Sequence, residues 1–212
     1  MTIFTSANRR LLLSLVALLI GPVAGAAELD AERVSAVKAA YLRYIAEYTT
    51  WPAQQTAGAP AAQRGRVPIM IGLLGSDPNG VTTLIRRRAE SGEGLSAQGR
   101  PLQVMNIEPS DVPGALLQQL EQCNVLFISE DAAHRWQSIH ALLGNRAIVT
   151  VGESAGFAQR RGMIEFVIDV DAGRVRMHIN LDAVNRADLT LSARLLGLKD
   201  GVTIVRDAGG IG

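Results

Sequence analysis

The chain has 212 residues and a formal net charge of +1, and 48% of its residues are hydrophobic. This length suits one domain with a core of its own. The balanced charge and the 4% of aromatic residues give no basic footprint for nucleic acid. The single cysteine excludes an internal disulfide.

The N-terminal residues have the three parts of a secretory signal peptide. Arg9 and Arg10 form a positive start, residues 11–20 are almost all apolar, and Ala24-Gly25-Ala26 fits the small-residue pattern before a cleavage site. A helix over that apolar run rises about 15 Å, which is too short for a hydrocarbon core of about 30 Å. We therefore expect a signal peptide over residues 1–26, cleaved after Ala26 or Ala27, and an exported periplasmic protein.

The first element expected in the mature chain is a helix that starts near Asp30. Pro52 disfavours helical geometry at Trp51, so the helix ends within residues 49–52. Residues 53–67 lack periodicity and are expected to form a surface loop. The apolar residues of the helix recur at helical spacing and form one apolar stripe made of Val34, Val37, Tyr41, Tyr44, Ile45 and Tyr48.

Short apolar runs then alternate with helical patterns. Strands are predicted at residues 69–74, 102–107, 125–128 and 147–151, and the continuous apolar run at 69–74 suits a strand covered on both faces, as in a parallel sheet. Helices are expected over residues 81–88, after a cap at Ser110 or Asp111, and before Gly144. The last two are expected to bury Leu116, Leu117, Leu120, Ala132, Trp136, Ile139 and Leu143.

The pattern changes after residue 160. Residues 163–168 and 174–179 alternate around a turn at 169–173, which predicts an antiparallel hairpin. Two short helices are expected after Asp182 and over residues 192–196. The predicted fold class is α/β, with a mostly parallel sheet, helices on both faces and a C-terminal antiparallel hairpin. Residues 27–206 are expected to form a single domain, and residues 207–212 a disordered tail.

One motif suggests a hydrolase. Gly152-Glu153-Ser154-Ala155-Gly156 matches the G-x-S-x-G nucleophile elbow and follows a predicted strand. Asp169 or Asp171 would supply the acid and His178 the base, but His178 falls on a hairpin strand rather than on a late loop. The alternative interpretation, which we favour, is a glycine-rich turn that ends a strand.

Other chemistry-bearing residues are scattered. The turn at residues 75–80 lacks the spacing of a phosphate-binding loop and is expected to be capped by Asp77 or Asn79. His134, His140 and His178 form no metal-ligand pattern, so no metal and no cofactor are expected. Cys123 precedes an apolar strand and is expected to be a buried thiol.

Several segments, in order, resemble the YfiR/HmsC family of small periplasmic proteins. The helix over residues 37–45 ends in Thr50-Trp51-Pro52, as the family's first helix does. The late segments Gly156-Phe157-Ala158 and Gly162-Met163-Ile164 are similar to the family's as well. Further matching segments bring the resemblance to about residues 37–198, and they are residues 71–80, 99–102, 123–129, 150–154, 179–183 and 191–196.

The resemblance implies a function that spacing alone does not. Members of the family repress an inner-membrane diguanylate cyclase by binding its periplasmic sensor domain, which lowers cyclic di-GMP and biofilm formation. An outer-membrane peptidoglycan-associated lipoprotein can sequester the repressor. The best-known members carry paired cysteines, whereas this chain has only Cys123, so redox control by internal disulfides is not implied here.

A repressor without catalytic machinery acts through a contact surface. Aromatic residues and arginine are the usual anchors of such surfaces. We expect the surface to use Tyr44, Tyr48 and Trp51 at the end of the first helix, or Arg174 and Arg176 on the wetter hairpin face. A homodimer is a further expected partner. The alternatives are a secreted serine hydrolase and a periplasmic binder of small ligands that uses the crevice at the carboxyl ends of the strands.

Overall fold

The computed structural model describes residues 31–52, 67–91 and 96–208. The predicted signal peptide with its cleavage site at Ala26, the expected helix cap at Asp30, and most of the loop at 53–67 lie outside these ranges. Residues 209–212 of the predicted tail lie outside them as well. Within the described ranges, no helix is long and apolar enough to cross a membrane.

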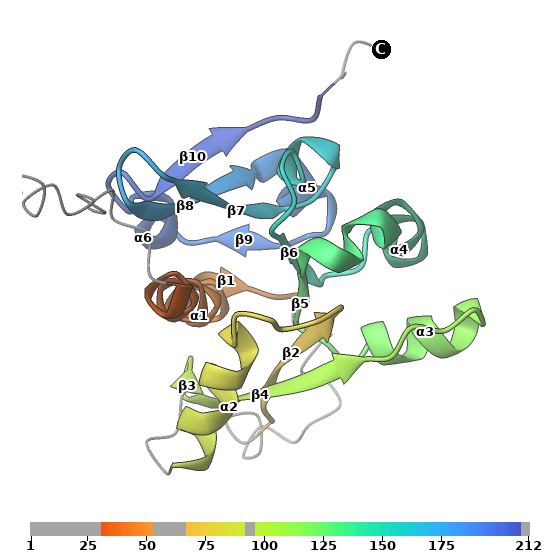
Figure 1. The fold of residues 1–212 in the computed structure, drawn as a ribbon. Coiled ribbons are helices and arrows are strands. Elements are labelled where there is room, and N and C mark those ends of the chain that lie inside the picture. Colours follow the sequence, from red (N-terminus) through yellow and green to blue (C-terminus); the bar gives the residue numbers. More distant parts are fainter. Residues whose placement is uncertain (1–30, 53–66, 92–95, 209–212) are drawn as a thin grey trace, which may run out of the picture.

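A single eight-stranded sheet runs through the molecule in the order β10-β8-β7-β6-β5-β2-β4-β3 (Figure 1). The five strands from β4 to β7 are mutually parallel, β8 is antiparallel to β7, and β10 runs parallel to β8. The α/β fold class and the C-terminal hairpin are therefore confirmed. The strands are β2 (Ile69–Leu74), β3 (Ser96–Ala97), β4 (Arg100–Ile107), β5 (Val125–Ile128), β6 (Val149–Gly152), β7 (Ile164–Asp169), β8 (Arg174–Asn180) and β10 (Val202–Val205).

Four short strands were not predicted from the sequence. The edge strand β10 is only partly buried, and β3 pairs with β4 over two residues. The other two, β1 (Thr49–Thr50) and β9 (Thr190–Leu191), pair with each other outside the main sheet. None of the four has the continuous apolar run that marks a strand buried on both faces, so the pattern used to find strands does not detect them.

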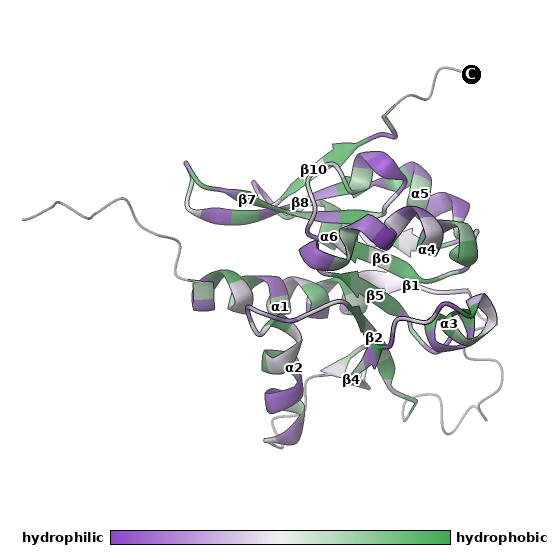
Figure 2. Ribbon diagram, turned by 45° about the vertical axis from the view of Figure 1, so that its right-hand side comes forward, coloured by the Kyte–Doolittle hydropathy of each residue, from purple (hydrophilic) through white to green (hydrophobic). Residues whose placement is uncertain are grey.

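Helices cover both faces of the sheet. In Figure 1, α1 (Ala31–Tyr48), α2 (Val81–Glu90) and α6 (Ala193–Leu196) lie on one side, and α3 (Pro113–Leu120) and α4 (Trp136–Leu143) lie on the other. The short helix α5 (Leu181–Arg186) contributes Ala183 and Val184 to the hydrophobic cluster that also contains the buried apolar residues of α1. Two 3₁₀ turns, η3 (Glu130–Arg135) and η4 (Ala158–Arg160), complete the second side. Figure 2 shows that β2 and β5, between the two layers, are mostly hydrophobic.

The buried face of α1 differs from the predicted stripe. Its buried residues are Val34, Ser35, Lys38, Leu42, Ile45 and Ala46. Tyr44 of the apolar stripe is 37% exposed, and Tyr41 and Tyr48 are only partly buried. The apolar stripe does not coincide with the buried face because apolar spacing leaves out Lys38, which is compatible with burial through a partner far along the chain.

The predicted helix ends have mixed outcomes. Asp77 stabilises the start of α2, because its carboxylate accepts from the Thr83 backbone N–H and from the hydroxyls of Thr82 and Thr83. Helix α3 begins at Pro113 without a side-chain cap, so the expected cap at Ser110 or Asp111 is wrong. A proline at the first helical position needs no partner for a backbone N–H, which reduces the need for a cap.

The structure confirms the predicted buried face of helix α4 and its predicted C-terminal end. Trp136, Ile139 and Leu143 are buried, and the chain leaves the helix at Gly144 with a positive φ. Leu116 and Leu120 of α3 are buried as expected, whereas Leu117 is only half-buried. Both helices pack on the same side of the sheet in a second hydrophobic cluster that includes the buried Cys123.

Candidate functional site

Two tyrosines and an arginine lie together on the C-terminal half of α1, where Tyr44 is exposed and Arg43 and Tyr48 are partly buried. The rings of Tyr44 and Tyr48 stack with their centroids 6.1 Å apart and an interplanar angle of 25°. The Arg43 guanidinium lies 5.9 Å from the centroid of the Tyr44 ring. Residues four apart lie on the same face of a helix, which explains the stacking. Together with Trp51 we call these residues the α1 patch: Arg43, Tyr44, Tyr48 and Trp51.

The backbone beneath the α1 patch is held from several directions. Thr49 and Thr50 pair with β9, and the Ser192 backbone N–H donates to the Tyr48 carbonyl. The Gln98 side-chain amide donates to the carbonyls of Ala46, Glu47 and Thr49. These bonds fix the direction in which the chain leaves the helix, so the aromatic side chains stand on a preorganised backbone.

Trp51 is partly buried against the main core. Its indole N–H is shielded from solvent and has no hydrogen-bond partner among the residues that the structure describes. A buried indole N–H normally finds a partner. Trp51 therefore combines a packed ring with an unsatisfied donor at the border of the α1 patch.

The two predicted hairpin arginines are held in ion pairs. Arg176 lies 2.7 Å from the Asp169 carboxylate, and Arg174 lies 3.9 Å from Asp169 and 4.0 Å from Asp200. Arg174 also lines a cavity of about 270 Å³ together with Arg33 and Tyr41. The carboxylates compensate the charges of both arginines, so these arginines are oriented within the hairpin rather than free.

The predicted contact residues fall into two groups. The Tyr41 hydroxyl donates to the Val175 carbonyl, which places the base of the hairpin beside the first half of α1. Burial there raises the pKa of Tyr41. From Tyr41 to Tyr48 the helix rises about 10 Å. The structure thus brings Tyr44 and Tyr48 into contact on the last part of α1, with Trp51 three residues after the helix, whereas Arg174 and Arg176 lie on β8, which meets α1 at Tyr41.

The G-x-S-x-G segment is a packed turn at the end of β6. Ser154 is buried, and its hydroxyl accepts a hydrogen bond from the Arg160 guanidinium at 3.0 Å. Among the described residues, no imidazole bonds to Ser154. A Cβ added to Gly152 would lie 2.5 Å from the Phe157 ring, so this glycine makes room for the ring. These contacts give a structural reason for the turn and no nucleophile–base pair.

An ion pair that the sequence analysis missed joins α1 to the carboxyl end of β6. Lys38 Nζ lies 2.5 Å from Glu153 Oε1, and the two side chains are only 6% and 12% exposed. The next strand contributes a second buried carboxylate, because Glu165 of β7 accepts from the backbone N–H groups of Gly156 and Ala158. Glu153 is thus paired with Lys38, and Glu165 accepts from two backbone N–H groups, so both buried carboxylates have the partners that buried charges need.

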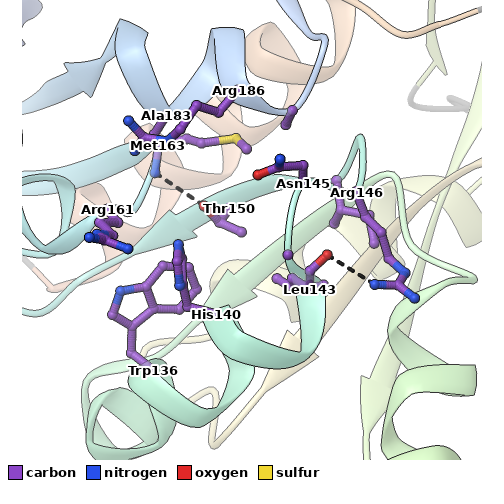
Figure 3. Close-up of a pocket in the computed structure, with 13 residues that line it drawn as sticks. Trp136, His140, Leu143, Asn145, Arg146, Thr150, Arg161, Met163, Ala183 and Arg186 are labelled. Carbon is purple, nitrogen blue, oxygen red and sulfur yellow. Dashed lines mark hydrogen bonds between the residues drawn. The ribbon is translucent and has the colours of Figure 1, made fainter.

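A cavity lies between α4, η4 and α5 (Figure 3). Its inner part, of about 30 Å³, and an adjoining groove, of about 760 Å³, share the residues Trp136, His140 and Arg161. The rings of Trp136 and His140 meet edge to face at 5.4 Å, and the Trp136 indole N–H donates to the Arg160 carbonyl. Burial lowers the pKa of His140, and the charges of Arg161 and Arg186 lower it further.

The C-terminal segment forms one wall of the groove. Asp207 accepts from the Asn180 side-chain amide at 2.6 Å and from Arg186 at 3.0 Å, and the Ala208 backbone N–H donates to the Gln159 carbonyl. The described residues contain no cluster of His, Cys, Asp and Glu side chains that could hold a metal ion. The groove is therefore lined by arginine, histidine and tryptophan side chains with one carboxylate.

The comparison with protein families decides the relationship. A family model described as YfiR/HmsC-like matches residues 35–199. The chain belongs to this family. The YfiR/HmsC-like match covers α1, every strand of the sheet except β10, and the groove apart from its C-terminal wall. YfiR/HmsC-like proteins are periplasmic regulators of diguanylate cyclases rather than enzymes, and they interact with the periplasmic domains of those cyclases.

Two further comparisons complete this description of the YfiR/HmsC-like chain. A search of curated proteins finds no match. Among solved structures, one match is described as the ABC domain in complex with L-Trp from Streptococcus pneumonia, at 14% identity and a TM-score of 0.47. That match covers 72% of this chain and 62% of the solved one, so the chain spans less than two thirds of its length.

Proposed function

We propose that this protein represses a membrane-bound diguanylate cyclase by binding the periplasmic sensor domain of the cyclase through the α1 patch. The observation that carries the proposal is the stacked pair Tyr44–Tyr48 beside Trp51 on an anchored backbone. Tyrosine, tryptophan and arginine are the residues that most often dominate binding energy at protein interfaces. Their rings lose little conformational entropy on binding when the backbone is already fixed.

Repression of this kind rests on differential affinity. A bound regulator holds an enzyme off only to the extent that it binds the off-state more tightly than the on-state. A change from mostly on to mostly off needs a preference of about 3–5 kcal/mol. A few aromatic anchors can supply such a preference, since single anchors contribute about 2 kcal/mol or more when they are fully covered by the partner.

The remaining expectations fit the same proposal. Export on a signal peptide cleaved near Ala26 would place the protein beside the sensor domain. The peptidoglycan-associated lipoprotein would then relieve repression by covering the same surface, and a homodimer would present two α1 patches.

Arg174 and Arg176 are the proposed second part of the surface, although their pairing with Asp169 leaves less charge for a partner. Within the described part of the chain, the recorded side-chain partner of Ser154 is Arg160 rather than a histidine, which does not favour the serine-hydrolase alternative.

The test compares Tyr44→Ala with Val112→Ala. Both side chains are exposed, at 37% and 63%, but Val112 lies at the start of α3, outside the α1 patch. In cells that carry the cognate cyclase, Tyr44→Ala is expected to raise cyclic di-GMP and to weaken binding of the purified sensor domain about tenfold or more. Val112→Ala should behave as the wild type.

Thermal unfolding separates binding from folding in this test. Tyr44→Ala should leave the unfolding midpoint nearly unchanged, because the ring is largely on the surface. Trp51→Ala is expected to lose binding as well, with some loss of stability from its packed ring. Normal repression by a folded Tyr44→Ala, Trp51→Ala double variant would remove the α1 patch from the interface.

A further inference from the structure

The groove beside α4 carries an uncompensated positive charge. Arg160, Arg161 and Arg186 line the groove and its inner part, whereas Asp207 is the one carboxylate there among the described residues. Arg146 also borders the inner part, but it pairs with Glu121 at 2.9 Å. Three arginines against one aspartate leave a local charge of about +2 with the histidines neutral.

The three arginines differ in what they already bind. Arg160 donates to the Ala155 carbonyl and to the Ser154 hydroxyl, and Arg186 pairs with Asp207. Arg161 has no carboxylate partner in the part of the chain that the structure describes. Figure 3 shows Arg161 on the same side of the cavity as the Trp136 and His140 rings. Arg161 is therefore the guanidinium that remains available to a ligand.

The backbone places Arg161 in an unusual conformation. Its φ is +67°, in the left-handed region that residues other than glycine rarely adopt. The following residue, Gly162, is tightly packed. A Cβ added to Gly162 would lie 2.3 Å from the Phe157 ring, and the Gly162 backbone N–H donates to the Phe157 carbonyl. Backbone strain of this kind is concentrated at functional sites. The tight turn thus fixes the backbone from which the Arg161 side chain extends.

The wall of the groove already contains one anionic group, the carboxylate of Asp207. Asp207 is held by the amide of the fully buried Asn180 and by Arg186. Burial is the main cause that lowers the pKa of His140, and the charges of Arg161 and Arg186 lower it further while Asp207 acts in the opposite direction, so the charges of the groove reach this ring. His134 and Gln137 line the open side of the groove and add neutral hydrogen-bonding groups.

We propose that this groove binds a phosphate group, either as inorganic phosphate or as a phosphate monoester. A phosphate carries a charge of about −1.5 to −2 near neutral pH, which matches the uncompensated charge, whereas a carboxylate would neutralise only half of it. Guanidinium groups bind phosphate oxygens through paired N–H donors. The groove of about 760 Å³ has room for an organic part beyond the phosphate. This site is independent of the proposed cyclase repression.

The experiment uses the purified full chain in phosphate-free buffer at about pH 7.5, where phosphate is largely dianionic. Calorimetry measures the binding of inorganic phosphate, phenyl phosphate and benzoate, and amide NMR spectra locate each ligand. Phenyl phosphate is expected to bind at least about tenfold more tightly than benzoate, which has the same ring and one charge. The amide shifts should centre on His140, Gly162 and Ala208.

Two variants identify the side chain responsible. Arg161→Gln should weaken phosphate binding about tenfold, which corresponds to about 1.4 kcal/mol, without a change in the unfolding midpoint. Arg88→Gln, on the exposed end of α2, is the matched control and should bind as the wild type does. Comparing inorganic phosphate with phenyl phosphate then shows whether the organic part contributes, and either ranking supports the site.

Three results would overturn the proposal. Benzoate could bind as tightly as phenyl phosphate, which would mean that charge does not select the ligand. Arg161→Gln could bind phosphate normally, which would place the ligand elsewhere. The third result is an absence of shifts at His140 and Gly162 on saturation with phosphate. Because none of these measurements involves the cyclase, their failure would leave the repressor function to be judged by the Tyr44 variant.

Discussion

At the scale of single residues, Gly72 and Cys123 share one small space between β2 and α3. A Cβ added to Gly72 would lie 2.4 Å from the Cys123 sulfur and 3.1 Å from Ile107. Cys123 is 2% exposed, and burial raises the pKa of its thiol to about 12. The expected buried thiol is thus confirmed, and its structural role is to fill the volume that glycine leaves open.

We predict that Gly72→Ala is destabilising because the added methyl group overlaps the Cys123 sulfur. Overpacking of this kind costs about 1–3 kcal/mol. Cys123→Ala in the same chain should recover much of that loss, because removing the sulfur makes room for the methyl group. Urea unfolding of the wild type, the two single variants and the double variant measures the coupling free energy between the two positions.

Gly114 supplies the control for this cycle. A Cβ added to Gly114 in α3 would meet nothing within 4 Å. Gly114→Ala should therefore be neutral or stabilising, since alanine reduces the conformational entropy of the unfolded chain. Additive effects of Gly72→Ala and Cys123→Ala would show that the sulfur does not determine the cost.

At the scale of elements, the ion pair Lys38–Glu153 connects helix α1 to the sheet. Lys38 lies in the first half of α1, while Tyr48 at its end and Trp51 just after it carry the proposed contact surface. The ion pair and the pairing of Thr49 and Thr50 with β9 therefore hold the helix at two separate points. The pair lies between a helix and a strand end that are 115 residues apart in sequence, so it forms only in the folded chain.

We predict that removing one member of this pair is far more harmful than removing both. Glu153→Gln leaves the Lys38 ammonium buried without an opposite charge, which costs about 3–5 kcal/mol in comparable cases. Adding Lys38→Met should restore most of the stability, because an apolar side chain of similar length fits the buried position. Thermal and urea unfolding of Glu153→Gln, of Lys38→Met and of the double variant measure these changes.

An exposed ion pair controls for the effect of charge alone. Arg146 and Glu121 are 2.9 Å apart but 40% and 51% exposed. Glu121→Gln should cost less than about 1 kcal/mol, as exposed pairs usually do. Equal losses from Glu121→Gln and Glu153→Gln would contradict the assigned importance of burial at Lys38.

At the scale of the whole molecule, the C-terminal segment joins the sheet edge to the groove. After β10 the chain returns to the body of the protein, where Asp207 binds Asn180 and Arg186. Asn180 is fully buried, and its side-chain NH₂ also donates to the Ala158 carbonyl. Its side-chain oxygen accepts from the Ala183 backbone N–H at the start of α5. One buried amide thus connects β8, η4, α5 and the C-terminal segment.

We predict that Asp207→Ala destabilises the protein by about 1–2 kcal/mol, because a buried amide donor loses its acceptor. Asp171→Ala, in the exposed turn of the hairpin, should change the stability little. Native-state hydrogen exchange of β10 should rise in the Asp207 variant and stay unchanged in the control. Unchanged exchange in β10 would show that Asp207 does not hold this edge.

Local patterns were sufficient for most of the elements. Continuous apolar residues predicted β2, β5 and β6, since a strand covered on both faces needs apolar side chains at nearly every position. The mixed segment at residues 102–107 located β4, whose residues are only alternately buried. The buried residues of α4 followed from helical spacing alone. The edge strand β10 was missed because Val202–Val205 is only partly buried and has no such run.

The candidate site was predictable only in part. The sequence identified the aromatic and arginine residues of the surface, but not that Tyr44 stacks on Tyr48 while Arg174 and Arg176 pair with Asp169 at the other end of α1. The groove was missed entirely. Its residues Trp136, Arg161, Arg186 and Asp207 come from separate segments and show no spacing pattern.

The sequence by itself determined the order of strands and helices, the α/β class and the family, because each depends on residues that are close together in the chain. The tertiary structure decided which side chains meet. Lys38 is buried against Glu153, which is 115 residues away in the chain, and Arg161 lines a cavity together with residues of α4 and the C-terminal segment. Such contacts depend on how distant segments pack, and local periodicity carries no information about that packing.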